Sequence, residues 1–187
     1  MKKPTLKPII AAICAAGILT VPTVRAASDG HVDFGKLSAL ATEGGQFVEV
    51  NVRSNLIAMV ARLAETQEPE AAGLLKRLHQ VHVNVIGLSE ENREALGEKV
   101  KSIRAQLEAD GWDRVVTVKE RDQDVGVYLK LRDEEAVEGI VVTVIDPGQA
   151  GVFINVVGDI RPEELAEIGE RFRIEPLKEI GLATTGR

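Results

Sequence analysis

The arrangement of the chain is decided by residues 112–157, which read WDRVVTVKERDQDVGVYLKLRDEEAVEGIVVTVIDPGQAGVFINVV. This stretch holds four runs rich in β-branched residues, and short polar connections with turn-forming residues separate them. We expect strands at Trp112–Lys119, Val125–Leu131, Val137–Ile145 and Val152–Val157. Strands joined by such short connections must run antiparallel. The stretch therefore predicts a four-stranded antiparallel meander.

Upstream of the meander, strand patterns and helix patterns alternate along the chain. Alternating apolar residues predict strands at Gln46–Val52 and Val81–Ile86. Helical spacing predicts a helix that Ser54 caps, a second at Glu70–Leu78, a third that starts at Ser89 and a last one that Pro162 opens. Because helices and strands are segregated late in the chain, we expect an α+β fold. It would consist of a mostly antiparallel sheet that ends in the meander, with the helices packed on one face.

Three of the predicted helices carry apolar residues at helical spacing. In the helix that starts at Ser89 they are Leu96, Val100, Ile103 and Leu107. The stripe of the first helix consists of Leu56, Met59, Val60 and Leu63. In the last helix we expect three apolar side chains to point inward, namely Leu165, Ile168 and Phe172.

Residues 1–26 have the layout of a secretory signal peptide. Three lysines precede an uncharged, mostly apolar run from Pro8 to Val24, and Val24-Arg25-Ala26 offers a cleavage site. A membrane anchor is the alternative, because the apolar run reaches the short limit of a membrane-spanning helix. We expect cleavage after Ala26 and export to the periplasm or the cell envelope.

The rest of the chain is expected to form one domain at residues 46–173. A polar amino-terminal segment at residues 27–45 precedes it, and a mobile tail at residues 174–187 follows it. No segment of the mature chain is apolar enough to predict a membrane span.

Composition narrows the classes of partner. Cleavage removes four basic residues and no acidic residue, so the formal charge falls from −6 to −10. Nucleic acids and anionic lipids are bound through Lys and Arg, so an acidic chain argues against both. The single cysteine, Cys14, lies in the leader, which excludes disulfides and thiolate metal sites from the mature chain. Lipidation at Cys14 is a further alternative, but Ile13 is larger than the small residue such signals require.

The mature sequence contains no recognisable catalytic constellation. Its serines stand in no nucleophile motif, and it has no glycine-rich phosphate loop. His79 and His82 would need further ligands to hold a metal, and no second cluster has matching spacing. Two acidic pairs lie in predicted hairpin turns, where charge is usually solvated. We therefore expect no catalytic residue, no cofactor and no metal ion.

The last two strands of the meander are apolar on both faces, so both faces of the sheet need cover. One explanation is that the amino-terminal segment or the final helix crosses the second face. The other is a surface for a protein partner or a second copy of the chain. The candidate interaction face in that case consists of Val141, Thr143, Ile145, Phe153, Asn155 and Val157.

Asn155 is a polar residue within an apolar strand, so its amide must find a hydrogen-bond partner or water. We expect it to bond to a neighbouring loop or to lie on a solvated face. A ligand contact is the alternative. An enzyme with a site near Asn155 and Asp159 would need a concave polar pocket there, with at least two titratable groups converging.

Several stretches resemble one family of bacterial envelope proteins. They are Phe47–Val52, Asn55–Val60, the Gly111-Trp112 junction and Val152–Ile160, of which the Asn155 strand followed by Gly158-Asp159 is the most recognisable. The sequence is similar to the family known as domain of unknown function 4252 over roughly Leu37 to Phe172. The resemblance implies an exported bacterial protein and supplies no activity and no catalytic residue. Some members look like lipoproteins, and Cys14 after Ile13 departs from that pattern.

Three functions are compatible with this sequence. The first is a non-enzymatic binding module of the periplasm or envelope, which contacts a protein partner or a second copy through its sheet face or edge. The second is an enzyme with an unfamiliar polar site near Asn155 and Asp159. The third is a structural or stress-response component of the envelope.

Overall fold

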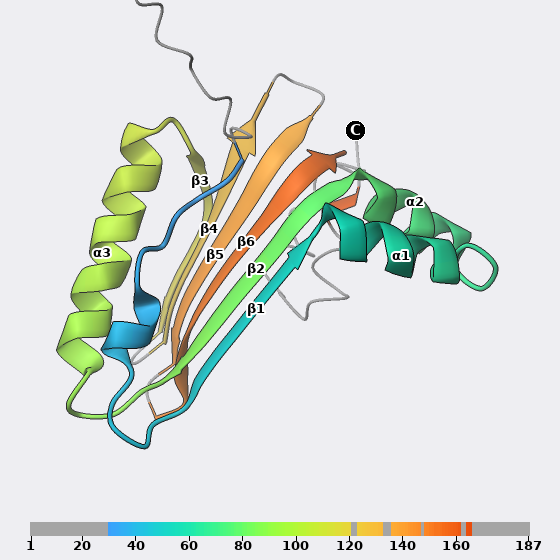
Figure 1. The fold of residues 1–187 in the computed structure, drawn as a ribbon. Helices are drawn as coiled ribbons and strands as arrows, with labels where there is room; N and C mark the ends of the chain where they lie inside the picture. The colour runs from blue at the N-terminus through green and yellow to red at the C-terminus, as the bar shows by residue number, and fades with distance from the viewer. Residues whose placement is uncertain (1–29, 121–122, 133–135, 147, 162–163, 166–187) are drawn as a thin grey trace, which may run out of the picture.

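The computed structural model describes residues 30–120, 123–132, 136–146, 148–161 and 164–165. The predicted α+β class is confirmed, because these residues form a six-stranded antiparallel sheet and three α-helices (Figure 1). The strands are β1 (Phe47–Arg53), β2 (Leu78–Gly87), β3 (Asp113–Glu120), β4 (Gln123–Leu131), β5 (Val137–Asp146) and β6 (Ala150–Ile160).

The strands lie in the order β1-β2-β6-β5-β4-β3. The predicted meander is confirmed, since β3 to β6 are consecutive neighbours and each pair is antiparallel. β2 pairs with β6, so that Val81 lies opposite Val156 although the two residues are far apart in the sequence. As a result β6 lies inside the sheet, and β1 and β3 form its two edges.

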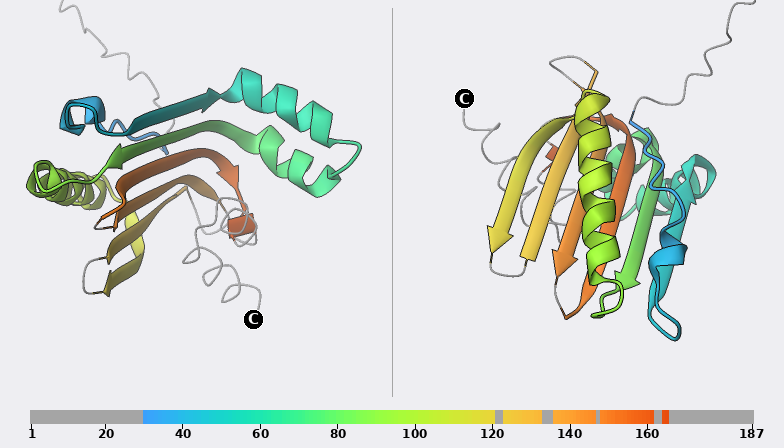
Figure 2. Two further views of the ribbon diagram at one scale, coloured as in Figure 1. Left: turned by 90° about the horizontal axis from the view of Figure 1, so that it is seen from below. Right: turned by 90° about the vertical axis from the view of Figure 1, so that its left-hand side faces the viewer.

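The helices differ in where they lie on the sheet. α1 (Ser54–Ala64) and α2 (Pro69–Arg77) form a hairpin at the end of β1 and β2, whereas α3 (Arg93–Ala109) crosses one face of the sheet (Figures 1 and 2). Ile57 of α1 and Leu74 of α2 join the apolar cluster of the opposite face. The prediction that all helices share one face is therefore corrected. The physical reason is that strands apolar on both faces require cover on both.

The face under α3 is also covered by residues 30–40, which we call the amino-terminal strap. The strap runs beside α3 (Figure 2) and ends in a short 3-10 helix, Leu37–Leu40. Val32, Phe34 and Leu37 of the strap are buried and pack in one cluster with the inward side of α3. The inward residues of α3 are Leu96, Val100, Ile103 and Leu107.

Several predictions fall outside the described residues. These are the signal peptide at residues 1–26, the mobile tail at residues 174–187, and the inward direction of Ile168 and Phe172. Leu165 is described, and it is buried in the cluster on the face opposite α3. No helix among the described residues has the length and apolar character that crossing a bilayer requires.

Candidate functional site

The six residues of the candidate interaction face lie under α3 and the amino-terminal strap. Five of them are at most 1% exposed, namely Val141, Thr143, Phe153, Asn155 and Val157, and Ile145 is half-buried. Of the two explanations for strands that are apolar on both faces, cover by the amino-terminal segment is thus the one that holds for this face. The five buried residues are part of the core, and they offer a partner no surface in this fold.

Asn155 holds the strap against the sheet. Its Nδ2 donates to the carbonyl oxygen of Gly30 at 3.0 Å and to that of Ile140 at 3.2 Å. Its Oδ1 accepts the backbone N–H of Val32 at 3.0 Å. Since these backbone groups occupy the amide and the side chain has no exposed surface, Asn155 cannot line an open pocket. The prediction that the amide bonds to a neighbouring segment is confirmed.

The strap can approach the sheet this closely because two glycines meet where it crosses β5. A Cβ added to Gly139 would lie 2.6 Å from the Cα of Gly30 and 2.6 Å from the Trp112 ring. No side chain fits at that separation, so glycine in this strand marks a close backbone approach. Strap, amide and glycine pair form one structural unit.

Asp159 serves a different part of the structure from Asn155. It lies four residues further along β6, which is about 13 Å in an extended strand. Its carboxylate accepts a hydrogen bond from Arg132 at 2.9 Å, and its carbonyl oxygen accepts one from Nε of Arg77 at 3.2 Å. The two residues proposed for an enzyme site therefore do not converge.

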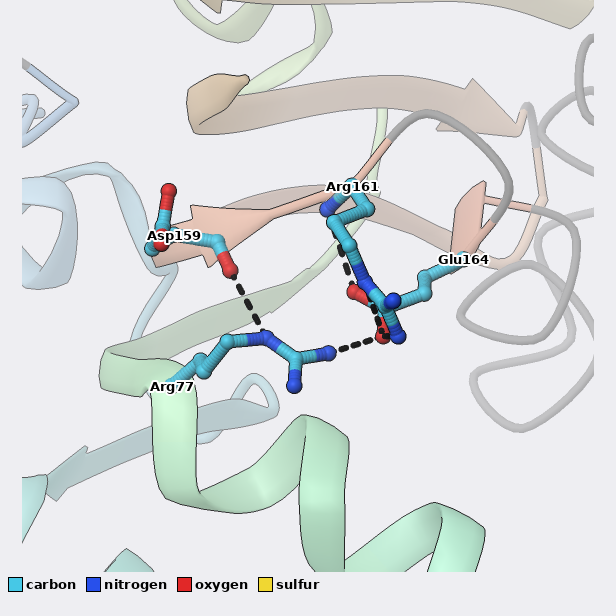
Figure 3. A network of polar contacts seen from close by, with 4 residues as sticks. All are labelled: Arg77, Asp159, Arg161 and Glu164. Atoms are coloured by element: carbon cyan, nitrogen blue, oxygen red, sulfur yellow. Dashed lines mark hydrogen bonds and ion pairs between the residues drawn. The ribbon is translucent and has the colours of Figure 1, made fainter. Parts of the chain in front are cut away.

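A polar cleft lies between α2 and the end of β6 (Figure 3). It encloses ≈ 380 Å³ and is lined by Pro69, Glu70, Gly73, Leu74, Arg77, Arg161 and Glu164. Glu164 is the centre of its network. The carboxylate pairs with Arg77, and it also accepts a 2.7 Å hydrogen bond from Nη2 of Arg161.

The electrostatics of this cleft favour a structural role. Burial raises the pKa of Glu164, but hydrogen bonds from Arg161 and Arg77 outweigh it and hold the pKa below its ordinary value. A carboxylate stabilised in its charged form is a weak proton acceptor, so Glu164 is poorly suited to general base catalysis. The network instead joins α2 to the chain that leaves β6.

The two histidines that were considered as metal ligands lie on β2, three positions apart. His79 lies at the register shift between Leu78 and Gln80, where the regular alternation of side chains along β2 is interrupted. Nε2 of His82 lies 3.0 Å from a carboxylate oxygen of Glu49, and His79 is exposed. Within the ranges that the structure describes, no three His, Cys, Asp or Glu residues gather in a way that could hold a metal ion.

Strand β1 presents a free edge of the sheet. Among the residues that the structure describes, it pairs only with β2, and its register with β2 runs through all seven residues without a shift. Val48 and Val50 point to the face opposite α3 and are 40% and 44% exposed. A regular edge strand offers unpaired backbone N–H and C=O groups to another strand.

Helix α1 follows β1 directly and turns its apolar stripe outward. Only Ile57 and Ala61 of this helix are buried. The predicted stripe is exposed instead, with Leu63 the most exposed of its members at 73%. We call the exposed apolar residues of both elements the β1–α1 surface. It consists of Val48, Val50, Leu56, Met59, Val60 and Leu63.

The sequence contains the signal for this surface, but the signal is ambiguous. Periodicity shows that α1 has an apolar side and that β1 has an apolar row, but not which element covers them. In the structure, α1 packs mainly against α2. Both β1 and α1 lie at the outer edge of the molecule (Figure 1). The β1–α1 surface therefore remains uncovered among the described residues.

The comparisons with known proteins agree with the resemblance found in the sequence. A family profile described as "Domain of unknown function (DUF4252)" matches residues 42–168, a range that contains every strand and α-helix described above. No curated protein and no solved structure matches the chain significantly. Because the profile covers more than half of the sequence, the chain belongs to the DUF4252 family, a family defined as a domain of unknown function.

Proposed function

We propose that this protein is an exported, non-enzymatic interaction module that binds a protein partner through its β1–α1 surface. The observation that carries the proposal is the exposure of six large apolar side chains on two consecutive elements. Single exposed apolar residues are ordinary, whereas an apolar group gathered on neighbouring elements is typical of a contact surface.

The chemistry of the surface indicates the kind of partner. The β1 edge suits an extended segment that adds a strand to the sheet, with main-chain hydrogen bonds as the common interaction. The outward stripe of α1 suits apolar side chains beside that segment. A protein meets both requirements, whereas the acidic composition disfavours nucleic acid and anionic membranes.

Export is the second part of the proposal, and the first 26 residues support it. They combine lysines, an apolar run and small residues in the order that a signal peptidase recognises. The partner would accordingly be found in the periplasm or the cell envelope.

The enzyme alternative has little geometric support. Asn155 is buried and bonded to backbone groups, and Asp159 pairs with Arg132. No observation specifically favours an envelope structural or stress-response role over binding in general.

Site-specific photo-crosslinking in the bacterial envelope tests the proposal. A photoreactive residue at Val50 or Leu63 of the full-length protein should form reproducible covalent adducts with protein. The same residue at Thr117, which is exposed on the other edge strand, is the matched control. Adducts at both edges alike, or at neither, would contradict the assignment of the β1–α1 surface.

A further inference from the structure

We infer that the partner of the β1–α1 surface is a second copy of this chain, joined by antiparallel pairing of the two β1 strands about a two-fold axis at Asn51. The inference rests on the proposed function and adds the identity of the partner. Two-fold dimers use the same patch on both subunits, so the patch must be complementary to itself. The backbone, the charges and the apolar row of β1 can each be tested for this property.

The backbone of β1 fits the proposed register. In an antiparallel ladder, alternate residues direct both backbone groups to the same neighbour. The N–H of Gly87 donates to the carbonyl oxygen of Gln46 at 2.7 Å, so even-numbered residues of this strand bond to β2. The odd-numbered residues direct their backbone groups outward, and they are Phe47, Glu49, Asn51 and Arg53. Asn51 can thus pair with its own copy by two N–H···O bonds.

The charges of β1 select this register over its neighbours. Glu49 and Arg53 are the only charged residues of the strand, and they lie symmetrically on either side of Asn51. Centring the axis at Asn51 places Glu49 opposite Arg53 of the other copy, twice. Centring it at Glu49 would place two like charges opposite each other, which destabilises a strand pair.

Both charged side chains are accessible for this pairing. The side chain of Glu49 is 51% exposed and rests against His82 at the strand edge. Arg53 is exposed and forms no ion pair in the part of the chain that the structure describes. Cross-strand pairs of opposite charge stabilise a sheet when they lie directly opposite.

The apolar side of β1 is also self-complementary. In the same register, Val50 lies opposite Val52 of the other copy, on the face away from α3. The row of valines would continue across the interface from Val50 and Val52 of one copy to Val52 and Val50 of the other, whereas Val48 would lie opposite Ser54, the first residue of α1. Pairing of the two β1 strands would leave β3 as the open edge of each sheet, and the ladder of β3 is interrupted by a register shift.

A charge-exchange experiment on the full-length protein, purified after export, tests the inference. Sedimentation equilibrium should show a dimer. Glu49→Arg alone and Arg53→Glu alone should each weaken the dimer at least tenfold, because each places like charges opposite one another. The double variant should restore it. Monomer at every concentration, or single variants that dimerise like the natural protein, would overturn the inference.

Disulfide trapping provides a second measurement that does not depend on affinity. Asn51→Cys in a Cys14→Ser background leaves one thiol per chain. Directly opposite residues that exchange hydrogen bonds have Cα atoms about 5.5 Å apart, within the range of a disulfide. Oxidation should yield a covalent dimer, whereas Thr117→Cys in the same background should not. Equal yields from both would overturn the inference.

The two proposals fail in different ways. If the protein is monomeric but photo-crosslinking at Val50 captures another protein, the second copy is excluded and the binding function stands. If neither self-association nor crosslinking depends on β1, both are contradicted.

Discussion

Strands β1 and β3 close the two ends of one sheet, but of these two edges only β3 has a ladder that a register shift interrupts. β3 has charged residues near both of its ends, and a register shift between Arg114 and Val116 interrupts its ladder with β4. β1 has a regular ladder and two exposed valines, and its charges, Glu49 and Arg53, are of opposite sign. Charges and bulges are the usual means by which proteins protect sheet edges. The difference indicates that β1 is an edge kept open for contact.

The largest expected effect comes from giving β1 the protection that β3 already has. Val50→Lys should weaken association with the partner about a hundredfold or more, because a charge would interrupt the apolar row at the edge. Folding stability should change little, since Val50 is already exposed. Titration of association together with thermal unfolding measures both. If Thr117→Lys in β3 weakens association equally, the two edges do not differ.

A substitution in the core should change folding stability but should not change how the β1 and β3 edges differ in association. Asn155→Ala leaves the buried carbonyl groups of Gly30 and Ile140 without their donor, and we expect a loss of about 2 kcal/mol. Denaturant unfolding measures it. Gln123→Ala, an exposed amide on β4, is the control and should change stability by less than about 0.5 kcal/mol. A neutral Asn155→Ala would contradict the assigned anchoring of the strap.

The cleft beside α2 predicts a dependence of stability on pH. The pKa of Glu164 is lowered in the folded state from its ordinary value of 4.5, so its contribution is present above that value. The contribution is lost as the pH falls through the folded pKa. Glu164→Gln should cost about 1 kcal/mol at neutral pH and flatten the acid limb of the stability profile.

The matched control for this prediction is an ion pair on the surface. Glu98→Gln removes the partner of Lys101 on an exposed side of α3, where such pairs contribute little. When unfolding is measured between neutral and acid pH, the stability of this variant should depend on pH in the same way as that of the natural protein. An acid limb that is unchanged in Glu164→Gln would show that the network carries no pH dependence.

The smallest expected effect comes from removing protection at β3. Lys119→Val takes away one charge next to Val118, and a several-fold rise in non-specific self-association should follow. Light scattering at increasing protein concentration measures it. The bulge in β3 remains in this variant, so a rise as large as a new stable dimer would mean that charge alone protects the edge.

The sequence predicted well those features that depend on neighbouring residues. Short polar connections determine the meander, because strands joined in this way have no room to cross over. The Asn155 amide was recognised because a polar group in an apolar strand needs a partner. The resemblance at the Asn155 strand also led to the family that the profile match confirms.

The sequence could not predict features that depend on distant contacts. The pairing of β2 with β6 joins residues that are 63 (Gly87 and Ala150) to 80 (Leu78 and Gly158) positions apart, and nothing local encodes it. The stripe of α1 is a second case. Leu56 and Leu63 have the spacing of a packed side, but the buried residues of α1 are Ile57 and Ala61 instead. Which side of an amphipathic helix is covered depends on the neighbours that the fold supplies.

Residue-resolved amide hydrogen exchange tests the central claim most directly. The outward N–H groups of Glu49, Asn51 and Arg53 have no partner strand among the described residues. These N–H groups should exchange rapidly in dilute protein. They should become protected in concentrated protein, or when the protein captured by photo-crosslinking at Val50 is bound. The outward amides of β3 should exchange alike in both conditions. Outward β1 amides that stay unprotected when the partner is bound would contradict the account.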